Sequence, residues 1–223
     1  MEARLTRISR EEALRYLGVR GEPDSVLSRD LDRCEAQLRS AVRPRAAWRL
    51  FSLAGDGSLA GTSFRPRGED LRRHLSGCGR VILMAATLGL ETEALLRRAQ
   101  SVRMADALLM DALASAAVEN VCDNLCEDLA RTFAPRRLTS RFSPGYGDFP
   151  LSQQRELCDV LNAGRLLGIS LTPGGMMIPQ KSVTAVLGLA GEGASAPARS
   201  GCEGCGLSAR CAFRKEGQSC EYT

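Results

Sequence analysis

The chain has 223 residues, of which 44% are hydrophobic and 25% are charged, a composition typical of a globular protein. Its net charge of +4 comes from scattered arginines, and only 4% of the residues are aromatic. Nucleic-acid binding is therefore disfavoured, because it needs a concentrated basic patch or stacking platforms. The first residues contain no apolar segment for export, and the apolar run 81–86 is too short to span a bilayer. We expect a cytoplasmic protein.

Two helices are predicted near the N-terminus. Ser9 and Glu12 have the spacing of a capping box, so a short helix should follow and stop at Gly18. Asp24 or Ser25 can cap a second helix, which Pro44 ends. The apolar residues of this second helix fall at steps of three and four, on one helical face: Leu27, Leu31, Cys34, Leu38 and Val42.

Strands are predicted in the middle of the chain. Residues 48–53 and 59–64 flank Gly55-Asp56-Gly57, which is a hairpin signal. After a short helix over 70–75, residues 81–87 are apolar on both faces, as in a central strand that is covered on both sides.

In the second half of the chain, the sequence predicts mostly helices, followed by a last strand. A helix opens at Gly89, and 104–131 contains no glycine or proline and predicts one long, largely buried helix. Ser152 is predicted to cap a helix that runs to 161. Two short extended segments, 169–171 and 176–178, precede a strand over 182–189.

These elements predict an α+β fold, in which helices pack on an antiparallel twisted sheet, because strands and helices do not alternate regularly. The domain is expected to cover 1–189. A flexible linker rich in glycine, alanine and serine is expected at 190–201, followed by a cysteine-rich tail at 202–223.

The segment 139–150 carries the clearest candidate site. Arg141 offers a planar fork suited to a carboxylate, and Tyr146 offers a ring face to an adenine or a cation. Gly145 lets a ligand approach the backbone closely, and Pro144 stiffens the turn. On these residues alone, an ordinary turn that leads into a capped helix is the favoured interpretation.

The run Arg141-Phe142-Ser143-Pro144-Gly145-Tyr146 resembles the Arg-x-x-Pro-Gly-Tyr signature of the activation (reactivation) domain of cobalamin-dependent methionine synthase. Further segments resemble that family in the same order and at similar spacing. They are Leu151-Ser152, Gly168–Thr172, Met176–Pro179 and Ser182–Thr184. The resemblance is clear from Ala112 to Leu189 and implies the activation-domain fold.

The resemblance implies that this loop binds S-adenosylmethionine. Arg141 would grip the methionine carboxylate, Ser143 and Gly145 would supply backbone contacts, and Tyr146 would pack against the ligand. Glu119 matches an acidic family residue on the preceding long helix, with Asp123 as the alternative. A family aspartate near the domain start and a family tyrosine beyond the last strand have no counterpart here.

The tail carries four of the nine cysteines: Cys202, Cys205, Cys211 and Cys220, in the pattern C-x2-C-x5-C-x8-C. Four thiolates match the ligand number of an iron–sulfur cluster or a structural zinc. Zinc sites usually present two close cysteine pairs, whereas only one exists here. The spacing therefore favours a [4Fe–4S] cluster over zinc. The other five cysteines are expected to be buried in the core, and His74, the single histidine, is expected at the surface.

The implied function is an accessory one. The chain would bind S-adenosylmethionine and dock on a separate cobalamin-binding methionine synthase or other corrinoid protein. There it would support reduction and remethylation of the cobalt, with flavodoxin or ferredoxin as a candidate electron donor. No catalytic side chain is assigned, because the corrin cobalt is the nucleophile. Two alternatives stay open: a non-catalytic subunit of a split methionine synthase, and an activator of another corrinoid methyltransferase.

Overall fold

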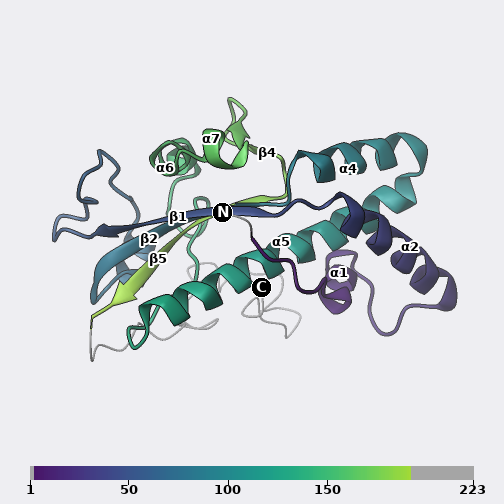
Figure 1. Ribbon diagram of the computed structural model, residues 1–223, viewed down its shortest axis with the longest axis horizontal. Helices are drawn as coiled ribbons and strands as arrows, with labels where there is room; N and C mark the ends of the chain where they lie inside the picture. The colour runs from purple at the N-terminus through teal and green to yellow at the C-terminus, as the bar shows by residue number, and fades with distance from the viewer. Residues whose placement is uncertain (1–2, 192–223) are drawn as a thin grey trace. The chain divides into compact units, whose positions relative to one another are not determined.

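The computed structural model describes residues 3–191 (Figure 1). The cysteine-rich tail and nearly all of the expected linker lie outside the described residues. The helices are α1 (Arg10–Tyr16), α2 (Ser25–Ala41), α3 (Glu69–His74), α4 (Leu90–Val102), α5 (Met104–Phe133), the short 3-10 turn η1 (Leu151–Gln153), α6 (Gln154–Leu161) and α7 (Ala163–Leu167). The strands are β1 (Arg45–Ser52), β2 (Cys78–Thr87), β3 (Ser170–Leu171), β4 (Met177–Ile178) and β5 (Ser182–Ala190).

The chain forms two compact units. The first unit comprises Met1–Ala47, Ala85–Leu129 and Asn162–Val183. The described residues of the second unit are 48–84, 130–161 and 184–191. The residues of the three long strands are divided between the two units.

The main sheet has the strand order β1-β2-β5. In the first unit, Arg43 N–H donates to Leu88 O at 2.9 Å, and Leu88 N–H donates to Lys181 O at 3.0 Å. These bonds join the beginning of one strand to the end of its neighbour, so the pairing is antiparallel. Residues 81–86 of β2 are fully buried. The predicted central strand and the α+β fold are both confirmed.

Side-chain caps fix where the first two helices of the first unit begin. The Ser9 side chain accepts a hydrogen bond from Glu12 N–H, and the Asp24 side chain accepts from Val26 and Leu27 N–H. The predicted starts of α1 and α2 are therefore confirmed, because these oxygens satisfy N–H groups that have no partner inside the helix. On α2, Leu31, Cys34 and Leu38 are buried, as the helical spacing predicts.

Two local predictions were wrong. Residues 59–64 form no strand, apart from a single bridge between Leu53 and Leu59. The Thr62 hydroxyl donates to Leu59 O and accepts from Phe64 N–H, which folds this segment into a turn. Ser152 does not cap α6: it lies inside η1, the turn that leads into that helix.

The short strands β3 and β4 pair antiparallel, with Ser170 opposite Ile178 and Leu171 opposite Met177. The turn between them is held by Thr172, whose N–H donates to Met176 O and whose hydroxyl accepts from Met176 N–H. The predicted extended segments around Pro173-Gly174-Gly175 are confirmed. Within residues 3–191, no helix is long and apolar enough to cross a membrane.

Candidate functional site

The candidate loop begins as an extended segment beside β5, in the second unit. Phe142 N–H donates to Val186 O at 3.0 Å, and Val186 N–H donates back to Phe142 O at 2.9 Å. Thr139 N–H donates to Gly188 O, and Gly188 N–H donates to the Thr139 hydroxyl. Because four bonds hold this segment, the backbone on both sides of Arg141 has a fixed position. The sequence prediction placed no paired segment here.

Residues 143–149 then form a compact turn. Gly145 N–H donates to Phe149 O at 2.8 Å, and Phe149 N–H donates to Tyr146 O at 2.9 Å. Tyr146 N–H donates to Ser143 O at 3.0 Å. Gly145 has φ +95°, a backbone conformation that residues with a side chain rarely adopt, so this position requires glycine. The predicted loop is confirmed, and its path is set by its own backbone bonds.

His74 supports this loop from α3. Its Nε2 lies 2.8 Å from Ser140 O, and its ring centroid lies 5.1 Å from that of Phe142. A carbonyl oxygen only accepts, so Nε2 carries the hydrogen that it donates to Ser140 O, and burial lowers the pKa of His74, which favours the neutral ring. The expectation of a surface residue was wrong: His74 is half-buried and holds the residues on either side of Arg141.

Asp148 joins the end of the turn to α3. Its two carboxylate oxygens accept from Glu69 N–H at 2.6 Å and Asp70 N–H at 3.0 Å. The residue that precedes the helix is Gly68, which has no side chain to cap it, so Asp148 supplies the cap from a distant part of the chain. The Glu69 bond, followed by the Asp70 bond, lowers the pKa of Asp148.

We expect Asp148→Ala to lower the free energy of unfolding at neutral pH, because two helix N–H groups lose their acceptor. The pKa of Asp148 is lower in the folded state, so its contribution is present above the ordinary aspartate pKa. That contribution disappears as the pH falls through the folded value. Denaturant unfolding across this pH range measures the difference between the two proteins. A difference that grows toward acid would contradict the assignment, and Asp148→Asn, which keeps an acceptor, is the matched control.

The turn brings four predicted residues together: Arg141, Ser143, Gly145 and Tyr146. The Tyr146 ring is 60% exposed and meets Phe142 edge to face, with centroids 6.2 Å apart. Arg141 and Ser143 are half-buried, whereas Gly145 is exposed. The turn thus carries an exposed ring, a guanidinium and an open backbone, which are the groups that a ligand with a flat part and a carboxylate requires.

Glu119 lies on α5 and belongs to the first unit, whereas the four residues of the turn belong to the second unit. It is half-buried, and its neighbour Asn120 accepts hydrogen bonds from Thr6 and Arg7 N–H. Burial, then the carboxylates of Glu12 and Glu119, raise the pKa of Tyr16 to about 12. The Glu119 carboxylate is therefore close enough to Tyr16 of α1 to act on its phenol. The alternative residue, Asp123, is exposed.

Within the described residues, no group of three or more histidine, cysteine, aspartate or glutamate side chains can hold a metal ion. The four cysteines predicted as ligands lie in the tail, outside those residues. Cys34, Cys78, Cys122 and Cys158 are buried, and Cys126 is half-buried. Their predicted place in the core is confirmed for the first four.

No protein-family model matches this chain, and no curated protein does. A solved structure matches: the crystal structure of the MetH reactivation domain bound to AdoHcy, with a TM-score of 0.58 and 16% sequence identity. The match covers 84% of this chain and 77% of that one. The chain has the fold of the MetH reactivation domain. At this identity the similarity establishes the reactivation-domain fold alone, and the activation-domain fold expected from the sequence is confirmed.

Proposed function

We propose that this chain binds S-adenosylmethionine at the turn that carries Arg141 and Tyr146, and that it serves the reactivation of a cobalamin-dependent methionine synthase. The observation that carries the proposal is the reactivation-domain fold, whose solved relative binds AdoHcy. The Arg-x-x-Pro-Gly-Tyr sequence on an exposed, rigid turn gives independent support.

Each residue of the turn has a role that its surroundings allow. The Arg141 guanidinium binds the methionine carboxylate of the ligand through two parallel hydrogen bonds. The exposed Tyr146 ring packs against the adenine or the sulfonium. Gly145 already donates its N–H to Phe149, so it contributes its carbonyl oxygen and close access to the backbone. Ser143 contributes its N–H and hydroxyl.

On the resemblance to the family alone, Glu119 is proposed to supply a negative charge for the amino or sulfonium cation of the ligand. Asp123, one turn further along α5, is the alternative. Exchange of Glu119 for glutamine and of Asp123 for asparagine, followed by calorimetric titration with S-adenosylmethionine, distinguishes the two. The residue that contributes is the one whose exchange weakens binding.

The proposed reaction consumes one electron and one methyl group. An electron reduces the inert cob(II)alamin of the partner to cob(I)alamin. The cobalt then attacks the methyl carbon of S-adenosylmethionine, the carbon–sulfur bond breaks, and methylcobalamin and S-adenosylhomocysteine form. The protein orients the sulfonium toward the cobalt. Holding the two reactants in the right geometry accelerates a reaction that would otherwise need two molecules to meet.

The test uses a cobalamin-dependent methionine synthase that lacks its own reactivation domain, trapped in the cob(II) state. We expect that adding this chain, methyl-labelled S-adenosylmethionine and a low-potential chemical reductant transfers the label to cobalt and restores methionine synthesis. If the labelled methyl stays on S-adenosylmethionine although the chain binds that ligand, the chain is a docking module or a subunit of a split enzyme. The absence in this sequence of the family's aspartate and tyrosine favours that second candidate.

We also propose that Cys202, Cys205, Cys211 and Cys220 hold a [4Fe–4S] cluster that delivers or relays the electron. The proposal rests on their spacing in the sequence, and a structural zinc is the alternative. Flavodoxin or ferredoxin would supply the electron to the cluster. The cytoplasmic location stays a prediction from the sequence.

Anaerobically purified protein is expected to be brown, with about four irons and four sulfides per chain, as a [4Fe–4S] cluster requires. Cys205→Ser should remove most of the iron, because it takes away one of four ligands. Cys126→Ser is the matched control, since Cys126 is a cysteine far from the tail in sequence. A colourless protein that holds zinc and no iron would eliminate the cluster.

A further inference from the structure

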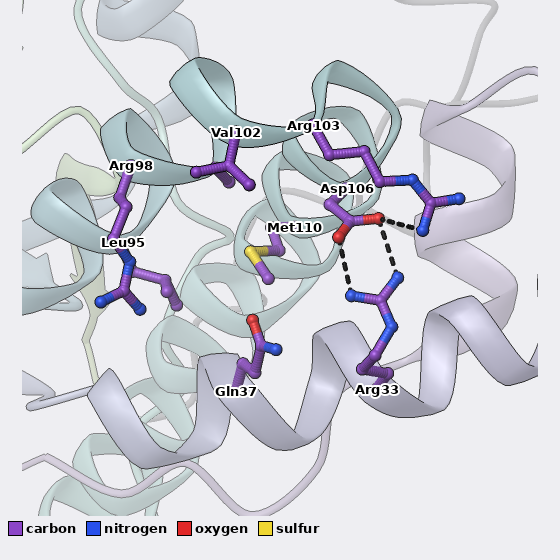
Figure 2. Close-up of a pocket in the computed structure, with 9 residues that line it drawn as sticks. Arg33, Gln37, Leu95, Arg98, Val102, Arg103, Asp106 and Met110 are labelled. Atoms are coloured by element: carbon purple, nitrogen blue, oxygen red, sulfur yellow. Dashed lines mark hydrogen bonds and ion pairs between the residues drawn. The ribbon is translucent and has the colours of Figure 1, made fainter.

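A pocket of about 310 Å³ lies among α2, α4 and α5 in the first unit (Figure 2). Its size falls at the lower end of the range for small-molecule sites. It contains none of the residues proposed to bind S-adenosylmethionine. Charged side chains and apolar side chains both line it, so it suits a ligand with one charged end and one hydrocarbon part.

One flank of the pocket is electrically balanced. Arg33 forms two hydrogen bonds with the carboxylate of Asp106, at 2.7 and 2.8 Å, and a third with Asp30 at 2.9 Å. Arg103 pairs with the same two carboxylates, at 3.1 and 3.3 Å. Two cations therefore meet two anions, and this network has no net charge left for a ligand. Figure 2 shows the contacts of Arg33 and Arg103 with Asp106.

Two other polar side chains of the pocket have no such partners. Among the residues that the structure describes, neither the Arg98 guanidinium nor the Gln37 side-chain amide forms a hydrogen bond or ion pair. Arg98 comes from α4 and Gln37 from α2, and Figure 2 shows both beside the same space, away from the Arg33–Asp106 pair. Arginine keeps its charge at any physiological pH. The pocket thus offers one unpaired cation and one amide donor.

Apolar residues complete the lining of the pocket. Leu95 and Ala99 of α4 and Met110 of α5 are buried, with exposed fractions of 8%, 8% and 2%. Val102, at the end of α4, is 80% exposed and extends the apolar surface to the rim. A hydrocarbon group that enters here removes its own surface and that of Val102 from water, which favours binding.

We propose that this pocket binds a small monocarboxylate that carries a hydrocarbon body. One carboxylate oxygen accepts from Arg98 and the other from the Gln37 amide, while the hydrocarbon covers Ala99 and Met110. A dianion such as phosphate fits less well, because Arg98 is the one cation of the described pocket lining that lies outside the balanced Arg33–Asp106 network. The inference is independent of the proposed S-adenosylmethionine site.

The test titrates the whole chain with butyrate, hexanoate and octanoate while amide NMR spectra are recorded, with hexan-1-ol as the uncharged probe. We expect the shifts to concentrate at residues 33–37 and 95–110. Affinity should rise roughly 15-fold from butyrate to hexanoate, as two more buried methylenes predict. Shifts scattered elsewhere on the protein, or equal binding of hexan-1-ol and hexanoate, would overturn the proposal.

Variants separate the two halves of the site. Arg98→Gln should weaken hexanoate binding by at least about tenfold, because a charge-assisted hydrogen bond is lost. Arg97→Gln makes the same charge change one residue away, outside the pocket lining, and should leave the affinity unchanged. Ala99→Leu should abolish octanoate binding by filling the apolar part. Equal affinities of Arg98→Gln and Arg97→Gln would refute the assignment of the head group.

Discussion

Exchange of Arg141 for alanine is expected to weaken the binding of S-adenosylmethionine and of AdoHcy roughly 10- to 150-fold, the value of a charge-assisted hydrogen bond to a carboxylate. The guanidinium is carried by a segment that β5 holds through backbone bonds at Phe142 and Thr139. The variant should therefore lose the ligand contact while the turn keeps its shape. Isothermal titration calorimetry measures the affinity of both proteins.

Two further variants sharpen the Arg141 experiment. Arg141→Lys keeps the charge but loses the planar fork, so an intermediate affinity is expected. Arg165→Ala removes an exposed arginine on α7 in the first unit and should bind like the unaltered chain. Because Arg141 also interacts within the protein, thermal unfolding is recorded for each variant. Full affinity in a folded Arg141→Ala would remove Arg141 from the site.

Exchange of Gly188 for alanine is expected to destabilise the protein by about 1–3 kcal/mol, the usual cost of adding a group to a filled core. A Cβ at this position would lie 2.5 Å from Cys78 Sγ and 3.1 Å from side-chain carbons of Leu75 and Thr139. These neighbours must move. Thr139 pairs with Gly188 through two hydrogen bonds, so the segment that leads to Arg141 must move as well.

Gly191→Ala is the matched control for the Gly188 variant. It lies just beyond β5, where a Cβ would meet no atom within 4 Å, and its stability should stay within about 0.5 kcal/mol of the unaltered chain. Denaturant unfolding gives both free energies. Calorimetry should show weaker AdoHcy binding for Gly188→Ala alone. Equal stabilities of the two variants would mean that the space around Gly188 is less filled than the distances indicate.

Local patterns in the sequence predicted the helices and the central strand. Ser9 and Asp24 act through N–H groups only two or three residues away, so their caps are visible in the sequence. The apolar run 81–86 likewise predicts a strand that is buried on both faces, and these residues are buried. Each of these predictions rests on residues that are near one another in the chain.

The parts that the sequence did not predict depend on contacts between distant residues. Asp148 caps a helix that begins 79 positions earlier, and His74 holds a carbonyl 66 positions later. Ser152 has the type and place of a cap, but the chain enters α6 through a 3-10 turn instead. The pocket beside Arg98 is lined by residues of three helices, so no local pattern in the sequence predicts it. The Arg141 turn was found through its resemblance to a family.

The most direct measurement of the central claim is a titration of the isotope-labelled chain with AdoHcy, followed by amide NMR. The account predicts saturable shifts that are largest at residues 139–149, the segment that holds Arg141 and Tyr146. Shifts at Arg98 and Gln37 should be absent, because that pocket is assigned a different ligand. A spectrum that AdoHcy leaves unchanged, or one that changes everywhere except at 139–149, would contradict the proposed S-adenosylmethionine site.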